Sequence, residues 1–216
     1  MEDYAKAIYA LQVQAGGPVT NNALAERLGV TAASASNMVK KLAALELAEH
    51  LPYRGVQLTP AGRRVALEVL RHHRLLELYL SQSLGVSWDR VHDEAEVLEH
   101  HISEELEELI AKALGNPTHD PHGDPIPTRD LELIEDVPCT LDSLEPGKRG
   151  RFTRISDHDP AMLRYLAQRG IAPGDEFEVV DKQPFGGPLF VRFEGGDVQV
   201  VGGELAAAMR VEEGQA

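Results

Sequence analysis

Two short helical patterns, a glycine turn and a hairpin signal follow one another within residues 21–58. The first pattern has Leu24 and Leu28 four residues apart and ends at Gly29. The second begins at Thr31, and its apolar stripe consists of Ala35, Met38, Val39, Leu42 and Leu45. Two β-like runs around the turn sequence Tyr-Arg-Gly come directly afterwards. Helix, tight turn, helix and hairpin predict a winged helix-turn-helix.

The rest of the chain predicts further helices and then a change of structural class. Helical spacing predicts helices at 2–14, from Pro60 to about Gly85 and from Trp88 to about Ala113. Short alternating runs and one helical stretch after Pro138 predict a small all-β barrel. The fold class is therefore a mainly α N-terminal part followed by a β-barrel. We expect a winged helix-turn-helix domain at 1–71, a helical domain with linker at 72–138, and the barrel at 139–216.

Composition narrows the class of protein further. The chain has 216 residues, is 43% hydrophobic and contains one cysteine, which excludes an internal disulfide and a CxxC metal or redox motif. No apolar run approaches the ~20 residues of a spanning helix, and no signal-peptide pattern opens the chain. We therefore expect a cytoplasmic protein with no membrane partner.

The formal net charge of −14 is unevenly distributed. Residues 1–71 carry eight Lys or Arg against six Asp or Glu, whereas residues 72–138 carry four against sixteen. Only the N-terminal third can therefore approach a polyanion without strong repulsion. The acidic middle third is either a solvated helical surface or a region whose carboxylates bind cations.

The second helix of the winged helix motif has the composition of a DNA-reading helix. Its exposed N-terminal face is expected to present small and amide side chains to base edges, namely Thr31, Ala33, Ser34, Ser36 and Asn37. Lys40, Lys41 and, at the wing tip, Arg54 suit phosphate contacts. Double-stranded DNA is therefore the predicted partner, and the alternative is a winged helix that binds protein.

Imidazole and carboxylate side chains recur at helical spacing in the acidic middle third. His92, Glu96, Glu99 and His100 fall at i, i+4, i+7 and i+8, which predicts one helix face. His73 and Glu77 form a similar pair on the preceding helix, and the following loop adds Asp120 and His122. Two facing helices with such pairs can build a divalent-metal site. Nitrogen and oxygen ligands without thiolate favour Mn²⁺ or Fe²⁺, while the simpler alternative is solvated carboxylates and ordinarily paired histidines.

At this point the chain resembles the diphtheria toxin repressor family of metal-dependent transcription regulators. The resemblance is carried by EDYAKAIY, ALAERLGVTAASASNMVKKL, LTPAGRRVAL, RHHRLLELYL, VHDEAEVLEHHIS and NPTHDPHGDPIP, which span most of residues 2–127. Residues 139–213 are similar to the family's SH3-like domain, which is related to the ferrous-transport accessory fold. The resemblance implies that residues 72–138 form a dimerisation and metal-binding domain and that the protein is a homodimer.

The resemblance also implies a mechanism and two ligand sets. Metal would order the first helix, and the dimer would then bind a palindromic operator and repress metal-uptake genes. One site would use Asp3, Glu96, Glu99 and His100. Its neighbour would use His73, Glu77, His92, Asp120, His122 and the barrel carboxylate Asp157. Iron-type members have Met and Cys where this chain has Asp3 and Glu96, so the hard oxygen ligands indicate a manganese-type member.

Two other classes compete with a manganese-responsive regulator. One is an iron-responsive regulator of the same family. The other is a metal-dependent enzyme, although the chain has no Gly-rich phosphate loop, no HExxH and no nucleophile motif. We therefore expect no enzymatic activity and no small-molecule substrate. A winged-helix regulator whose acidic helices serve only for dimerisation also fits, and DNA binding without metal would identify it.

Overall fold

The computed structural model describes residues 1–133, 139–155 and 159–214, which form two compact units. The first unit comprises Met1–His73, Leu98–Glu107 and Pro127–Leu133. The second comprises Arg74–Val97, Glu108–Ile126 and the described part of Ile134–Ala216. Three of the boundaries between these units, after His73, Val97 and Glu107, fall inside helices rather than at linkers. The three-domain division at 71 and 138 therefore stays a prediction.

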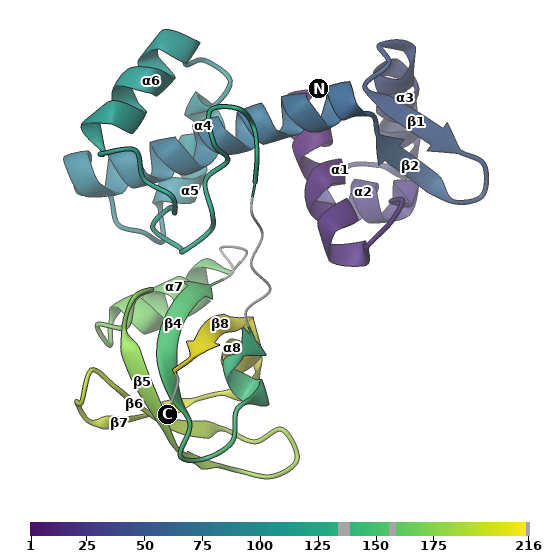
Figure 1. The fold of residues 1–216 in the computed structure, drawn as a ribbon. Helices are drawn as coiled ribbons and strands as arrows, with labels where there is room; N and C mark the ends of the chain where they lie inside the picture. Colours follow the sequence, from purple (N-terminus) through teal and green to yellow (C-terminus); the bar gives the residue numbers. More distant parts are fainter. Residues whose placement is uncertain (134–138, 156–158, 215–216) are drawn as a thin grey trace. The chain divides into compact units, whose positions relative to one another are not determined.

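The winged helix-turn-helix is confirmed in the first unit. Its elements are α1 (Glu2–Ala15), α2 (Asn21–Arg27), α3 (Ala32–Ala44), β1 (Ala48–Leu51) and β2 (Gly55–Leu58). Figure 1 shows the three helices gathered beside the two-stranded wing. Threonine side chains begin α2 and α3, because Thr20 accepts from the Ala23 N–H and Thr31 accepts from the Ser34 N–H.

One apolar core holds α1 against the helix-turn-helix and the wing. Ile8, Leu24, Leu42 and Val56 are buried in it. The side chain of Gln12 adds a polar tie, because its Oε1 accepts a hydrogen bond of 3.1 Å from the Leu58 N–H of β2. A displacement of α1 therefore disturbs the packing of the whole DNA-reading motif.

The helical region that follows differs from the sequence prediction in one element. It contains α4 (Pro60–Leu84), α5 (Val91–Leu98) and α6 (Glu104–Ala113). The predicted single helix from Trp88 to Ala113 is therefore wrong. Ser103 accepts a hydrogen bond of 3.3 Å from the Leu106 N–H, and acidic residues fill the first turn of α6. That capping pattern starts a new helix within the run.

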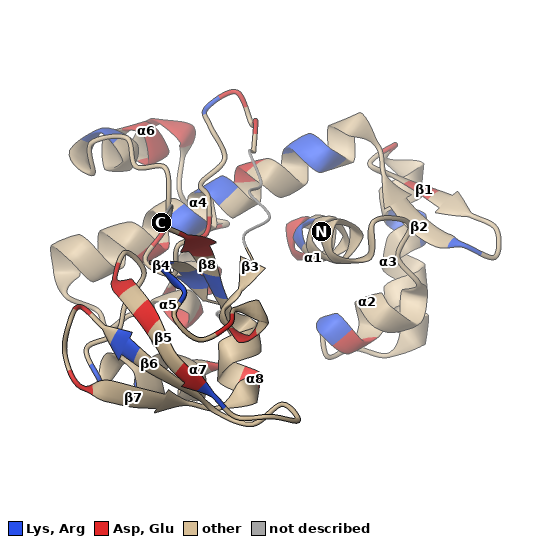
Figure 2. Ribbon diagram, turned by 60° about the horizontal axis from the view of Figure 1, so that its bottom comes forward, with Lys and Arg blue, Asp and Glu red and all other residues tan. Residues whose placement is uncertain are grey.

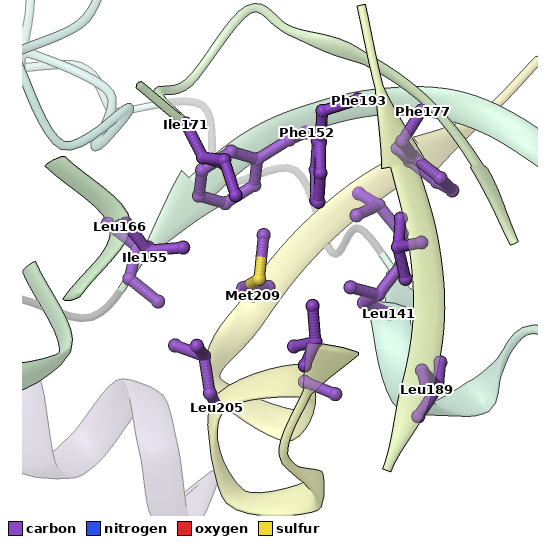
Figure 3. Close-up of a cluster of buried hydrophobic side chains, with 14 of the residues drawn as sticks. Leu141, Phe152, Ile155, Leu166, Ile171, Phe177, Leu189, Phe193, Leu205 and Met209 are labelled. Carbon is purple, nitrogen blue, oxygen red and sulfur yellow. The ribbon is translucent and has the colours of Figure 1, made fainter. Parts of the chain in front are cut away.

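The barrel lies in the second unit. Its elements are β3 (Cys139–Thr140), a 3₁₀ turn (Leu141–Ser143), β4 (Arg149–Ile155), α7 (Pro160–Ala167), β5 (Glu176–Lys182), β6 (Leu189–Phe193), β7 (Val198–Val201), α8 (Gly203–Ala208) and β8 (Met209–Glu213). The strands form an antiparallel sheet in the order β3-β8-β4-β5-β6-β7. Figure 3 shows Phe152, Phe177 and Met209 converging in its core. The predicted all-β barrel is confirmed.

Three short elements of the barrel were not predicted. They are β3, α8 and β8. They are two, six and five residues long. Among the described residues, no helix combines the length and the apolar character needed to cross a membrane.

Candidate metal centres and nucleic-acid interface

Asp3, Glu99 and His100 meet in the first unit, in a group that we call centre 1. Each offers one ligand atom, and these atoms lie within 4.8 Å of one another. Asp3 lies in the first turn of α1, whereas Glu99 and His100 lie in the turn after α5. The expectation that Glu99 and His100 share a helix face with His92 and Glu96 is wrong, because α5 ends at Leu98. The turn nevertheless brings both side chains to the start of α1.

Two carboxylates bracket the imidazole of His100. Its Nε2 lies 2.6 Å from Asp3 Oδ1, and its Nδ1 lies 2.6 Å from Glu2 Oε2. With the Nδ1 proton donated to Glu2, Nε2 is the nitrogen that can coordinate an ion beside Asp3. A carboxylate that orients a metal-binding histidine in this way makes the coordinating nitrogen of the imidazole more basic. The sequence did not predict a role for Glu2. Its one signal is that Glu2 is a second acidic residue directly before Asp3.

The carboxylate of Glu99 is completely buried and surrounded by positive or polar groups. Lys6 Nζ lies 2.6 Å from Glu99 Oε1, and His73 Nδ1 makes a short contact with Glu99 Oε2. His73 was assigned to the second ligand set, but this contact also connects it to centre 1. Figure 2 shows acidic and basic residues together at the N-terminal end of α1.

Glu77, Asp120 and His122 form a second group, centre 2, within the second unit. Their ligand atoms lie within 4.8 Å of one another and all three residues are buried. Glu77 Oε1 lies 3.3 Å from His92 Nδ1 and 3.9 Å from His122 Nδ1. Four of the six residues assigned to the second ligand set therefore meet around the Glu77 carboxylate. A fifth, His73, precedes Glu77 by one turn on α4.

The imidazole of His122 is prepared to coordinate a cation. Its Nε2 lies 2.8 Å from the Trp88 carbonyl oxygen, which can only accept a hydrogen bond, so the ring proton belongs on Nε2. Nδ1 then carries a lone pair, and it is buried without a hydrogen-bond partner among the described residues. A buried nitrogen acceptor beside two carboxylates is unfavourable until a cation or a proton binds it.

Burial, together with the charges of Asp124 and Glu77, raises the pKa of Asp120 well above its usual value. Arg74, whose Nε lies 3.7 Å from Asp120 Oδ2, opposes the shift without cancelling it. The metal-free pocket thus favours a proton on a group that would coordinate an ion as a carboxylate. A divalent cation removes the mutual repulsion of these acidic groups, so the donor set of centre 2 fits one.

The loop that carries Asp120 and His122 is folded tightly against β4. Asp120 Oδ1 accepts hydrogen bonds from the N–H groups of His122 and Asp124, at 2.8 and 2.9 Å. The carbonyl of His122 accepts a hydrogen bond of 3.0 Å from the Ile155 N–H. Gly123 has φ +86°, and a Cβ there would lie 1.9 Å from the Thr153 carbonyl oxygen. Only glycine allows this approach.

Two of the proposed ligands are not members of centre 1 or centre 2. Glu96 lies on α5, in the second unit, whereas the other members of its ligand set lie in the first. Asp157 lies outside the described residues. Both remain predictions from the resemblance.

The predicted DNA-reading residues lie on α3 and the wing. Thr31, Ala33, Ser34 and Asn37 are exposed, as are Lys40, Lys41 and Arg54. Ser36 differs: it is half-buried, and its hydroxyl accepts a hydrogen bond of 2.9 Å from the Asn21 side chain. Ser36 therefore joins α3 to α2 in addition to any contact with DNA. Arg54 is the one Lys or Arg of residues 48–58, and Figure 2 shows basic colour at the wing next to β2.

Comparison with known proteins assigns a family to each part of the chain. Residues 1–56 match the N-terminal DNA-binding domain of the iron-dependent repressors, and residues 59–128 match their metal-binding and dimerisation domain. Residues 139–213 match the FeoA domain.

Relatives along the whole length agree with this assignment. The diphtheria toxin repressor of Corynebacterium diphtheriae is 31% identical, over 98% of this chain and 96% of its own. The iron-dependent repressor IdeR of Mycobacterium tuberculosis is 30% identical over the same shares. A solved structure of a manganese-dependent transcriptional repressor with manganese has a TM-score of 0.88 and 42% identity, covering 98% of this chain and 99% of that one.

Proposed function

Because this chain belongs to the iron-dependent repressor family, we propose that it is a repressor that binds operator DNA when Mn²⁺ occupies its metal centres. The observation that carries the proposal is centre 1. Its ligands join the start of α1 to the turn after α5, inside the unit that holds the winged helix. A bound cation therefore acts directly on the DNA-reading motif.

The available donors support manganese as the metal. Asp3, Glu99 and His100 offer two carboxylates and one imidazole in centre 1, and Glu77, Asp120 and His122 offer the same set in centre 2. Hard oxygen and nitrogen donors without sulfur suit Mn²⁺. When bound, the ion supplies positive charge that holds these carboxylates together. The 42% sequence identity to a manganese-dependent repressor supports the same choice.

The chain's own packing transmits the state of centre 1 to the wing. Ile8 and Tyr9 of α1 are buried in the core that also contains Leu42 of α3 and Val56 of β2. Fixing Asp3 therefore fixes α1, and α1 fixes α3 and the wing. A metal shifts this equilibrium only because it binds the assembled arrangement of ligands better than the separated one.

We further propose a homodimer formed through the helical region. Leu98, Leu106 and Leu109 remain 38%, 45% and 58% exposed in the single chain. Apolar residues of the same helical region that do not contribute to this surface are covered within the chain: Leu75, Leu76, Leu78, Leu80 and Ile110. The matching metal-binding and dimerisation domain supports a dimer, and a two-fold dimer requires a palindromic operator.

Iron is the second candidate metal, because the curated relatives at 30–31% identity include iron-dependent repressors. Activation of DNA binding by Mn²⁺ and by Fe²⁺, compared under anaerobic conditions, separates the two. The same relatives support regulation rather than catalysis, because they are repressors and the similarity covers nearly their whole length.

The test is a gel shift on DNA selected from a random pool with the Mn²⁺-loaded protein. Binding is expected to disappear when a chelator removes the metal and to return when Mn²⁺ is restored. The His100→Ala variant is expected to stay unbound at the same Mn²⁺ concentration. Binding that persists in chelator would overturn the proposal.

A further inference from the structure

Lys6 reaches the same carboxylate that centre 1 would use to hold a metal. It follows Asp3 by three residues on α1, so both side chains lie on one helix face. Its Nζ is 2.6 Å from Glu99 Oε1, and the same oxygen is 3.5 Å from His100 Nε2. The ammonium therefore bonds to the Glu99 oxygen that faces the other ligands.

This ion pair is mostly removed from solvent. The Lys6 side chain is 18% exposed and that of Glu99 is 0% exposed. A buried carboxylate without a counter-charge is strongly unfavourable, so Lys6 stabilises the metal-free arrangement. The pair also holds α1 against the turn after α5 before any cation arrives.

The same ammonium opposes a divalent cation. An ion bound to Glu99 Oε1 must share this oxygen with Lys6 or displace it. In a site with little solvent, sharing brings two positive centres close together, and displacement removes a charge-assisted hydrogen bond. Either way the affinity of the centre for metal falls.

We propose that Lys6 is a tethered positive charge that competes with the metal for Glu99 and so sets the metal concentration at which centre 1 fills. The inference rests on the proposed function. It adds to that function the residue that sets the metal concentration needed for activation. Lys6 is a positioning residue and not a ligand.

A merely structural role for Lys6 makes a different prediction. If Lys6 only anchored α1, its removal would loosen centre 1 and weaken both folding and metal binding. If it competes with the metal, its removal lowers the thermal stability of the metal-free protein while it strengthens metal binding. The two effects have opposite signs, so one pair of measurements separates the two roles.

The experiment titrates Mn²⁺ into the full-length protein by calorimetry, and the centre 1 transition is the one that His100→Ala removes. We expect Lys6→Met to tighten that transition by about tenfold or more, with a lower Tm of the metal-free protein. Lys6→Arg keeps the charge and should match the unmodified protein. Lys148→Met serves as control, because Lys148 is an exposed lysine of the barrel whose partner, Glu213, belongs to neither centre. Lys6→Gln replaces Lys6→Met if the latter does not fold.

Unchanged or weaker Mn²⁺ binding in the neutral variant would overturn the inference and leave the proposed function intact. A failure of the unmodified protein to show a transition that depends on His100 would overturn the proposed function as well. The two failures are therefore distinguishable in one set of titrations.

Discussion

At the scale of single residues, centre 1 depends on one buried carboxylate. Glu99 is in contact with Lys6 and His73, and its Oε1 is 3.5 Å from His100 Nε2. No other residue of the turn after α5 combines a ligand atom with complete burial among the described residues. Glu99 is therefore the side chain through which a metal would act on α1.

The first prediction concerns this residue and its neighbour. Glu99→Ala and His100→Ala should each abolish Mn²⁺-dependent DNA binding, because each leaves centre 1 with two ligands. Glu105→Ala on the exposed face of α6 should change the affinity for DNA by less than about twofold. Fluorescence anisotropy with labelled operator measures all three. Equal losses in the Glu99 and Glu105 variants would contradict the assignment.

The second prediction concerns Glu2, which orients His100 without entering the ligand set. Glu2→Gln keeps the size of the side chain but weakens the hydrogen bond to Nδ1. We expect centre 1 to lose about 10-fold to 100-fold in Mn²⁺ affinity. Glu2→Asp should lose less, because the charge remains. A titration in which Glu2→Gln matches the unmodified protein would show that Glu2 is only a surface neighbour.

Residue types and spacing indicated Glu99, His100, Asp120 and His122 as candidate ligands without any structure, and the family resemblance added Asp3. They could not predict that Trp88 sets the proton position on His122, because its backbone carbonyl has no signature in sequence. They also could not predict Glu2, because one acidic side chain beside another at a helix start is common on solvated surfaces.

At the scale of elements, centre 2 depends on the close packing of the loop that carries Asp120 and His122 against β4. Gly123→Ala should disrupt this packing, because the new Cβ would approach the Thr153 carbonyl oxygen to 1.9 Å and φ is +86°. We expect a loss of about 1–3 kcal/mol in the free energy of unfolding. Mn²⁺ affinity should fall at centre 2, with centre 1 unaffected.

Calorimetric titration and a thermal melt measure these effects. Gly115→Ala is a suitable control, because Gly115 also has positive φ but a Cβ there would meet nothing within 4 Å. If Gly123→Ala bound Mn²⁺ at centre 2 as the control does, the loop would not need its close approach to β4.

Elements with clear periods and caps were predicted from sequence, and interrupted or very short ones were not. The winged helix and α4 follow directly from threonine and proline starts and glycine ends. The break between α5 and α6 was overlooked because apolar spacing continues across it, while Ser103 starts a new helix. β8 was overlooked because its strand partners β3 and β4 are distant in sequence.

At the scale of the whole molecule, the acidic middle third is expected to lie at a subunit interface. Leu106 and Leu109 are three residues apart on α6, so they share one exposed helix face. Leu109→Glu should shift the protein to monomer in analytical ultracentrifugation with Mn²⁺ present, and operator affinity should fall with it. Leu84→Glu, also exposed, is the control. If the Leu109→Glu variant remained a dimer, the interface would not include this face of α6.

The central claim is that metal and DNA bind the same arrangement of the chain. Linkage then requires that each ligand raises the affinity for the other by one common factor. Mn²⁺ affinity measured by calorimetry, with and without saturating operator, tests this directly. We predict that saturating operator raises the affinity of the protein for Mn²⁺. The increase should equal the factor by which Mn²⁺ raises the affinity of the protein for DNA. Equal Mn²⁺ affinity in the presence and absence of DNA would contradict the account.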